Sequence, residues 1–216
     1  MMAEKAFIFD MDGVIIDSEP LHARAKKAAL REFGLDLEVD DLYFAHYVGR
    51  SAKSFFCDIA AQHPECTASW ETMAAKKHEI YLKLLTEDES IEAIEGIREL
   101  LARLKANGYK IGLASSSVLN VVRLVLTRFG IIDYFQCITG GNEVTHAKPS
   151  PDIYLLAAQR LGADPADCTV VEDANAGVRA AKAAGMHCIA VYNPHSGKQD
   201  LSMADQIITR YEEIEL

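Results

Sequence analysis

The 216-residue sequence lacks the features that mark a membrane, secreted or nucleic-acid-binding protein. No segment approaches the roughly 18 consecutive apolar residues that a membrane span requires. The first apolar run, at 6–9, is closed at once by Asp10, so it is too short for a signal peptide. Basic residues are few: 22 Lys and Arg stand against 32 Asp and Glu, and the formal charge of −10 disfavours binding to a phosphate backbone. We therefore expect a cytoplasmic protein whose partner is neither a membrane nor a nucleic acid.

Paired cysteines are also missing from the sequence. The chain has five cysteines, none of them in a CxxC pair, at positions 57, 66, 137, 168 and 188. A zinc site or a disulfide framework would need paired spacing. We predict reduced, buried thiols.

The composition is that of an ordinary globular protein, with 50% hydrophobic and 25% charged residues. The chain shows no internal repeat and no low-complexity segment. Its length suggests one domain, or one domain with an insert. A chain of this size can bury a full apolar core.

Short apolar runs alternate with amphipathic segments over most of the chain. Strands are predicted at 6–9, 111–114, 168–171 and 188–191, with weaker candidates at 135–138 and 206–208. Helices are predicted at 118–129, 151–161 and 174–184, each followed directly by a glycine, and a further helix marked by apolar residues from 97 to 104 is closed by Asn107-Gly108. This alternation predicts an α/β fold, a Rossmann-like doubly wound parallel sheet with helices on both faces.

One stretch departs from the alternation. Residues 17–91 contain helical spacing only, with candidate helices near 21–33, 54–61 and 69–85. We interpret this stretch as an inserted α-helical cap domain at 17–91, and 1–16 with 92–216 as the core domain.

Two pairs of acidic residues follow predicted strands. Asp10 and Asp12 follow the strand at 6–9, and Glu172 and Asp173 follow the strand at 168–171. In a parallel sheet the carboxyl ends of the strands line the ligand crevice. Acids that converge there form an oxygen-rich site suited to Mg²⁺. Taken singly, each pair could instead be an Asp-Gly turn or a helix cap.

A run of hydroxyl residues and a lysine complete the set of candidates. Ser115 and Ser116 follow the strand at 111–114, where hydroxyls and free N–H groups at a helix start can hold a phosphate. Lys148 stands before Pro149 in a restricted loop and can neutralise phosphate or carboxylate charge. A simple helix cap and a surface lysine are the alternatives.

The order of these motifs resembles the haloacid dehalogenase-like phosphohydrolase superfamily over nearly the whole chain. Asp10-x-Asp12-Gly13 is similar to its first motif, Ser115 to its second, Lys148 to its third and Glu172-Asp173 to its fourth. The stretch FDMDGVIIDSEPLH at 9–22 further resembles the subgroup with a helical cap after the first motif. That subgroup contains β-phosphoglucomutase and sugar-phosphate phosphatases.

The resemblance implies a mechanism. Asp10 attacks phosphorus to form an aspartyl-phosphate, and Asp12 protonates the leaving alkoxide and then activates water. Ser115, with the backbone N–H of Ser116, and Lys148 hold the phosphoryl group. Mg²⁺ is bound by Asp10, the backbone carbonyl of Asp12 and Asp173, with Glu172 as a further ligand or as a partner through water. Dehalogenating members typically lack an acid at the position of Asp12, which argues against that activity.

Cap residues then decide the substrate. The resemblance assigns His22 to positioning Asp12 and the substrate, and Lys77 to substrate binding. β-Phosphoglucomutases carry a cap arginine in a Gly-x-Ser-Arg pattern, but here Ala52 stands at that position, flanked by Arg50 and Lys53 as possible substitutes.

The missing arginine favours a phosphatase of small phosphorylated sugars or polyols over a β-phosphoglucomutase that interconverts β-glucose 1-phosphate and glucose 6-phosphate. A non-catalytic phosphate-binding protein is disfavoured because every core motif is present. For this architecture we expect a monomer acting on a small phosphorylated metabolite.

Overall fold

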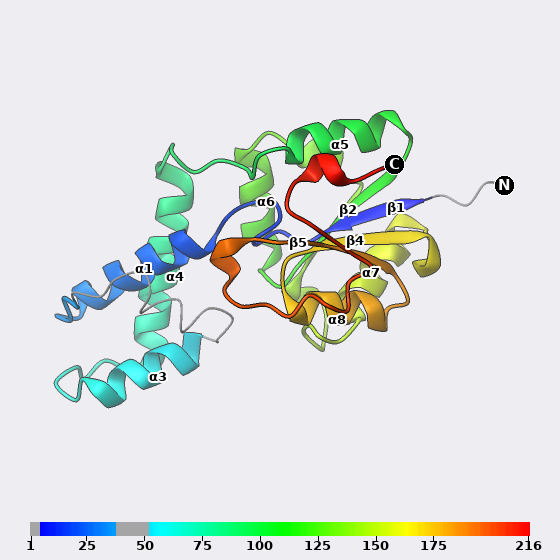
Figure 1. The fold of residues 1–216 in the computed structure, drawn as a ribbon. Helices are drawn as coiled ribbons and strands as arrows, with labels where there is room; N and C mark the ends of the chain where they lie inside the picture. Colours follow the sequence, from blue (N-terminus) through cyan, green and yellow to red (C-terminus); the bar gives the residue numbers. More distant parts are fainter. Residues whose placement is uncertain (1–4, 38–51) are drawn as a thin grey trace. The chain divides into compact units, whose positions relative to one another are not determined.

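The computed structural model describes residues 5–37 and 52–216, and the chain divides into two compact units (Figure 1). The first, called the core unit here, comprises Met1–Asp17, Glu92–Pro194 and Lys198–Leu216. The second, called the helical unit, comprises Ser18–Ile91 and His195–Gly197. Each unit packs around its own apolar residues and is described by itself.

A six-stranded parallel sheet forms the centre of the core unit, with strand order β3-β2-β1-β4-β5-β6. The central strand β1 pairs with both β2 and β4, so that Phe9 lies opposite Leu113 and Val171. The predicted doubly wound α/β fold is confirmed. The strands are β1 (Ala6–Phe9), β2 (Lys110–Ser115), β3 (Cys137–Gly140), β4 (Cys168–Glu172), β5 (His187–Val191) and β6 (Gln206–Ile208).

Side chains of β1 alternate between two apolar layers, because successive residues of a strand point to opposite faces. Ala6 and Ile8 pack with buried residues of two helices, α7 (Asp152–Leu161) and α8 (Asn175–Ala183). Phe7 stacks edge-on against Tyr109, and their ring centroids are 5.3 Å apart. Burial on both faces explains why the strands read as continuous apolar runs.

Two further helices belong to the core unit, α5 (Ile97–Ala106) and α6 (Leu119–Arg128). In Figure 1, α5 covers the face of the sheet opposite α7 and α8. The four helices begin and end within two residues of the ranges expected from the sequence. Short 3₁₀ turns, η1 to η5, connect the remaining segments: Ile132–Tyr134, Gly141–Glu143, Pro165–Asp167, Pro194–Ser196 and Tyr211–Glu213.

One strand is displaced from its expected position. The sequence predicts a strand at 135–138, whereas β3 spans Cys137–Gly140. The backbone N–H of Gln136 donates to the carbonyl of Ile111 at 2.8 Å, and its side-chain Oε1 accepts from the N–H of Ile111 at 2.6 Å. Gln136 therefore bonds to β2 just before the regular pairing of β3 with β2, which begins at Cys137.

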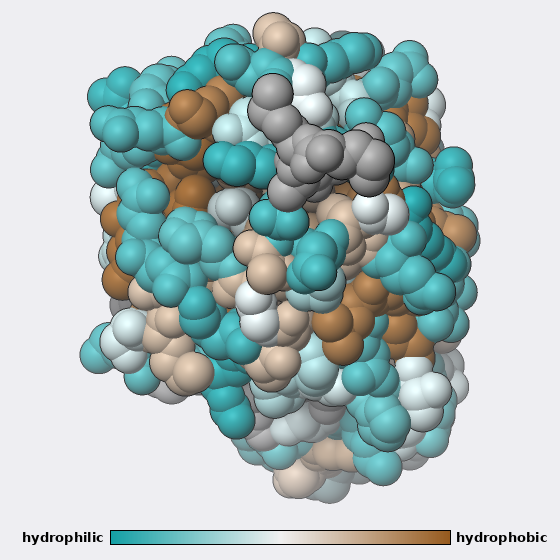
Figure 2. Space-filling view, turned by 90° about the vertical axis from the view of Figure 1, so that its right-hand side faces the viewer, coloured by the Kyte–Doolittle hydropathy of each residue, from teal (hydrophilic) through white to brown (hydrophobic). Residues whose placement is uncertain are grey.

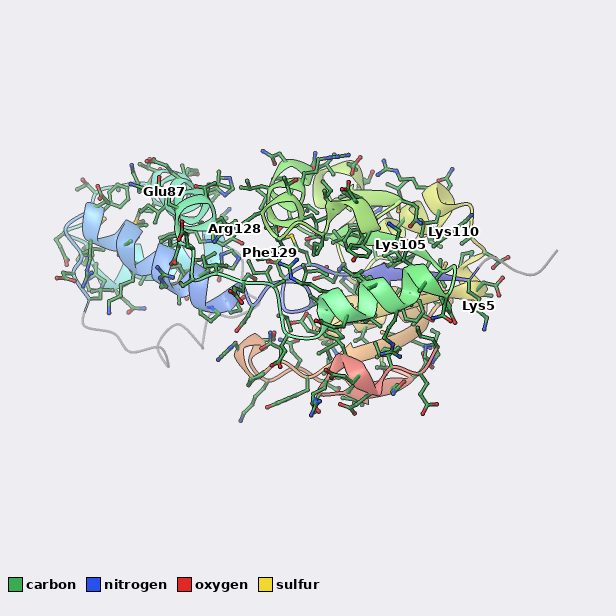
Figure 3. All side chains as sticks on the ribbon, turned by 90° about the horizontal axis from the view of Figure 1, so that it is seen from above. Lys5, Glu87, Lys105, Lys110, Arg128 and Phe129 are labelled. Atoms are coloured by element: carbon green, nitrogen blue, oxygen red, sulfur yellow. The ribbon has the colours of Figure 1, made fainter. Side chains whose placement is uncertain are left out.

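Long basic side chains connect separate segments of the core unit (Figure 3). Lys110 Nζ donates to the carbonyl of Leu161 at 2.6 Å, at the end of α7. Lys105 Nζ lies 5.3 Å from the ring centre of Tyr134, and Arg98 donates to the carbonyl of Phe129. Lys110 begins β2 and therefore lies at the edge of the sheet opposite the one at which the acidic motifs follow the strands.

In the described part of the helical unit, 18–37 and 52–91, three helices are seen: α1 (Glu19–Glu32), α3 (Ala52–Gln62) and α4 (Trp70–Glu87). Ser69 caps α4, because its side-chain oxygen accepts the N–H of Thr72 at 3.3 Å. The apolar faces of the three helices meet in one cluster, as the predicted helical spacing requires. The buried members of that cluster are Leu30, Leu35, Phe55, Phe56, Ile59 and Met73.

The cysteines are free thiols, as predicted, but they are not all buried. Burial raises the pKa of Cys137 and of Cys168 to about 11 and that of Cys188 to about 12, so these thiols stay protonated near neutral pH. Cys57 is exposed and Cys66 is half-buried, so the expectation of burial is wrong for these two.

The face of the molecule in Figure 2 is largely hydrophilic, with apolar side chains between the polar ones. Among residues 5–37 and 52–216, no helix has both the length and the apolar character needed to cross a lipid bilayer.

Candidate active site

Three strand ends bring predicted site residues to one edge of the sheet. Asp10 follows β1, and its N–H donates to the carbonyl of Val171 at 3.0 Å, which extends the pairing with β4 by one step. Ser115 ends β2 and Glu172 ends β4. The three side chains are buried. Because the strands are parallel, this is the carboxyl edge at which doubly wound sheets bind their ligands.

Lys148 lies at the centre of these groups. Its ammonium donates to Asp10 Oδ1 at 2.5 Å, to Glu172 Oε1 at 2.7 Å and to the carbonyl of Ala114 at 3.2 Å. The side chain of Lys148 is only 8% exposed, so the surface-lysine alternative is wrong. The loop that carries it is fixed by Asp152, which accepts hydrogen bonds from Ser150 Oγ and His146 Nδ1.

The carboxylate of Glu172 accepts four hydrogen bonds. Lys148 and the hydroxyl of Tyr154, each at 2.7 Å, donate to Oε1. The backbone N–H groups of Asp173 and Ala174 donate to Oε2 at 2.9 and 3.0 Å. A carboxylate offers about four lone-pair directions. Glu172 is therefore held rigidly, and direct metal binding would require it to give up one of these partners.

Burial and mutual charge set the protonation of this cluster. Burial, reinforced by the carboxylates of Glu172, Asp12 and Asp173, holds the pKa of Asp10 well above its usual range, although Lys148 opposes the shift. Burial also disfavours the Lys148 ammonium, but Asp10 and Glu172 outweigh it and raise the pKa of Lys148. Burial opposes ionisation of Glu172 as well, yet Lys148 and the other donors lower its pKa. The ion pair is the state in which both charges are tolerated.

The cluster carries more negative charge than Lys148 can compensate. Oxygen atoms of Asp10, Glu172 and Asp173 lie within 4.8 Å of one another, and all three residues are buried. A set of carboxylate oxygens at this spacing fits a hard divalent cation such as Mg²⁺. Asp10 and Asp173 are the side chains best placed to hold it.

Gly13 makes room for Asp173. Its backbone is left-handed, with φ of 75°, and a Cβ added at Gly13 would lie 1.8 Å from Asp173 Oδ2. No side chain fits in this position without displacing the carboxylate. The glycine that follows the first acidic pair is thus part of the acidic site and not merely of a turn.

The serine loop follows β2 and connects to Asp12. Ser115 Oγ accepts the backbone N–H of Ser117 at 3.0 Å, and Ser117 Oγ donates to Asp12 Oδ2 at 3.1 Å. Ser116 between them is exposed. Helix α6 begins just after this loop, so its N-terminal N–H groups face the same region.

The helical unit holds a second group of candidate residues. Lys77 Nζ donates to His22 Nδ1 at 2.9 Å, and the His22 ring stacks on Tyr81 at 4.3 Å between centroids. Burial, and after it the neighbouring Lys77, Lys26 and His78, holds the pKa of His22 well below its usual range. Histidine is therefore the neutral partner and lysine the charged one.

The structure thus brings the candidates together in two sets. The first lies in the core unit and the second, His22 with Lys77, in the helical unit. Arg50 lies outside the described residues, and Lys53, its proposed alternative, has its ammonium 5.4 Å from the ring centre of Trp70. The core set comprises Asp10, Asp12, Ser115, Ser116, Lys148, Glu172 and Asp173.

Two residues that contact this site were not selected from the sequence. Ser117 could have been chosen as a candidate, since it is the third hydroxyl residue in the run after β2. Tyr154 ends the stretch 148–154, which resembles the same subgroup, but the resemblance assigned it no role. Its contact with Glu172 depends on how α7 packs against the sheet.

Comparison with known proteins gives a consistent set of relatives. The family profile described as haloacid dehalogenase-like hydrolase matches residues 7–191. β-Phosphoglucomutase of Bacillus subtilis is 35% identical over 189 residues, covering 87% of this chain and 83% of that protein. Hexitol phosphatase B of Escherichia coli K12 is 33% identical, covering 88% and 85%.

Longer proteins and solved structures are similar as well. Protein SUPPRESSOR OF QUENCHING 1, chloroplastic, from Arabidopsis thaliana is 38% identical over 189 residues, but this chain spans only 18% of its length. The crystal structure of CbbY from Rhodobacter sphaeroides in complex with phosphate superposes with a TM-score of 0.82 at 28% identity, covering 98% of this chain and 96% of that one.

Replacing Lys148 with methionine should destabilise the protein in a pH-dependent way. The variant leaves Asp10 and Glu172 buried without a counter-charge, a loss of about 3 kcal/mol in the free energy of unfolding. Their folded pKa values then lie above the unfolded values of about 4, so stability falls as pH rises through the folded pKa. Urea unfolding with a chelator present should show a large deficit at pH 8 and a smaller one at pH 5. A Lys5→Met control should change little, and an equal Lys148→Met deficit at both pH values would contradict this account.

Replacing Gly13 with alanine should weaken Mg²⁺ binding by about tenfold or more, because the new Cβ displaces Asp173. Titration calorimetry with Mg²⁺ measures the effect directly. Gly108→Ala is the matched control: its φ of 77° imposes the same backbone penalty, but no atom lies within 4 Å of the added Cβ. Equal affinities in the two variants would show that Asp173 does not hold the cation.

Proposed function

Because the chain belongs to the haloacid dehalogenase-like hydrolase family, in the subgroup of β-phosphoglucomutase and sugar-phosphate phosphatases, we propose that it hydrolyses a phosphate monoester of a small sugar or polyol. The observation that carries the proposal is the buried carboxylate of Asp10, held by Lys148, with a second carboxylate two residues further along the chain. That pair supplies a nucleophile and a separate proton donor. The name of hexitol phosphatase B, a relative of similar length, supports this substrate class.

Asp10 is the proposed nucleophile. It must be ionised to attack phosphorus, whereas burial and its acidic neighbours favour the protonated form. The Lys148 ammonium at 2.5 Å counteracts this and fixes the carboxylate in place. The attack forms the bond between an Asp10 oxygen and phosphorus while the bond from phosphorus to the leaving oxygen breaks.

Asp12 is the proposed general acid and base. Its carboxylate lies beside the serine loop and is only partly buried. It donates a proton to the leaving oxygen in the first step and removes one from water in the second. Ser115 and the N–H of Ser116 bind phosphate oxygens, and Lys148 offsets their charge.

Mg²⁺ is the proposed cofactor, held by Asp10, Asp173 and the backbone carbonyl of Asp12. When bound, it would reduce the repulsion between the Asp10 carboxylate and the phosphate dianion. Glu172 completes the site by keeping Lys148 and the loop of Asp173 in position, through the four hydrogen bonds it accepts.

We assign substrate selection to residues 17–91 acting as a cap domain, with His22, Lys77 and Arg50 as the substrate-binding residues. Lys77 supplies a positive charge and is oriented by its hydrogen bond to neutral His22. A cation in this position suits a polar, anionic metabolite better than an apolar one.

A β-phosphoglucomutase is the second candidate, favoured by the 35% identity to the Bacillus subtilis enzyme of that name. The mutase reaction would require tight binding of a second phosphate group. Ala52 stands at the position of the expected cap arginine, and the cationic group of neighbouring Lys53 lies over Trp70. The phosphatase is therefore the first choice.

A panel of sugar and polyol phosphates with Mg²⁺ separates the two candidates. It includes β-glucose 1-phosphate with a trace of glucose 1,6-bisphosphate, and free phosphate and glucose 6-phosphate are measured together. We expect selective phosphate release, lost on chelation of Mg²⁺. Asp10→Asn should lower it on the order of a thousandfold or more. Formation of glucose 6-phosphate without matching phosphate release would establish the mutase instead.

Replacing Lys77 with methionine should raise KM for the preferred sugar phosphate about tenfold while kcat changes little, since a binding charge is removed and the core residues remain. Lys83→Met is the matched control on the same helix, because its ammonium lies 3.9 Å from Glu87 on an exposed face. If kcat falls and KM is unchanged, Lys77 does not act in substrate binding.

A further inference from the structure

We propose that Ser117 is a positioning residue that orients Asp12 for proton transfer, an inference that rests on the proposed phosphatase function. The resemblance to the family assigns Ser115 and Ser116 to phosphate binding and leaves Ser117 without a role. The structure gives Ser117 a direct contact with the acid/base carboxylate.

Each polar group of Ser117 is engaged. Its N–H donates to Ser115 Oγ at 3.0 Å, its carbonyl accepts from the N–H of Gly141 at 2.8 Å, and its hydroxyl donates to Asp12 Oδ2 at 3.1 Å. Ser117 thus links the serine that would bind phosphate with the carboxylate that would transfer the proton. The backbone hydrogen bonds fix the position of Ser117, from which its hydroxyl reaches one oxygen of Asp12.

The 3₁₀ turn that follows β3 packs against the serine loop and the start of α6. A Cβ at Gly141 would lie 2.2 Å from the carbonyl of Ser116, so only glycine allows the turn to approach the serine loop this closely. Asn142 Oδ1 accepts the N–H of Leu119 at 3.0 Å, where α6 begins. The serine loop is therefore anchored at the residues on both sides of its hydroxyl contact.

The contact distinguishes the two oxygens of Asp12. The Ser117 hydroxyl occupies Oδ2. The other oxygen, Oδ1, is buried and has no hydrogen-bond partner among the described residues. Ser117 thus holds one oxygen of the carboxylate and leaves the other, Oδ1, as the oxygen assigned to contact a substrate oxygen.

With Oδ1 as the oxygen that transfers the proton, the bonds formed and broken are accounted for in both the transfer of the phosphoryl group to Asp10 and its hydrolysis. In the first, Oδ1 of Asp12 gives its proton to the leaving oxygen as the bond between phosphorus and that oxygen breaks and the Asp10–phosphorus bond forms. In the second, a water oxygen bonds to phosphorus, its proton passes to Oδ1, and the Asp10–phosphorus bond breaks. Ser117 keeps its own proton throughout and holds Oδ2 in both steps.

The test compares two substrates of similar size that differ in their need for a proton. Benzyl phosphate releases an alkoxide that must be protonated, and p-nitrophenyl phosphate releases a stable phenolate that need not be. In single-turnover experiments with excess enzyme and Mg²⁺, Ser117→Ala should slow release of benzyl alcohol about tenfold to a hundredfold. Release of p-nitrophenolate in the same turnover should stay close to the wild-type rate. Ser117→Thr, which retains the hydroxyl, should restore benzyl alcohol release, and the exposed Ser202→Ala control should match the wild type.

Two results would overturn the inference. Equal decreases in the single-turnover rate on both substrates would indicate a defect in phosphate binding or folding. Unchanged rates on both would show that Ser117 does not position Asp12 for proton transfer. Failure of the wild-type protein to release phosphate from every member of the sugar and polyol phosphate panel would instead remove the proposed function, and the inference with it. The wild-type and variant measurements therefore separate the two failures.

Discussion

The ammonium of Lys148 lies between the carboxylates of Asp10 and Glu172, at 2.5 and 2.7 Å, in a site almost closed to water. Each of these charges would be costly to bury alone, and each is tolerated only because the others are present. The ion pair therefore requires three segments far apart in the sequence to meet: the end of β1, the end of β4 and the loop before α7. The central position of β1 between β2 and β4 is what allows them to do so.

Close backbone approaches make the same site possible. Gly13 leaves space for Asp173, and Gly177 on α8 leaves space for Glu172, since a Cβ there would lie 1.7 Å from Glu172 Oε1. Gly141 does the same for the serine loop. The acidic cluster is thus built by packing backbone against side chain, and the serine loop by packing backbone against backbone. This explains how Asp10 and Asp12, only two residues apart, have different surroundings: Asp10 faces an ammonium and Asp12 faces a hydroxyl, as their separate proposed roles require.

Much of this arrangement could be predicted from the sequence, because the strongest signals are local. Apolar runs set the strands, glycines end the helices, and Asp10, Ser115 and Glu172 each follow a strand, so a parallel sheet brings them together. Contacts that depend on tertiary packing could not be predicted. The role of Tyr154 as a donor to Glu172 becomes visible only when α7 is placed on the sheet, and β3 starts two residues late because the side chain of Gln136 bonds to Ile111. The exposure of Cys57 follows from which face of α3 packs inward, which a single helix does not reveal.

In the proposed mechanism, the buried carboxylate of Asp10 becomes covalently phosphorylated during turnover. The most direct test is to quench the Mg²⁺-loaded protein with acid during turnover of its best substrate and to map the phosphoryl group on proteolytic peptides by mass spectrometry. We predict an acid-stable, base-labile phosphoryl group on the peptide that contains Asp10, appearing and disappearing at the rate of turnover. Continued phosphate release with no phosphoryl adduct on that peptide would contradict the account.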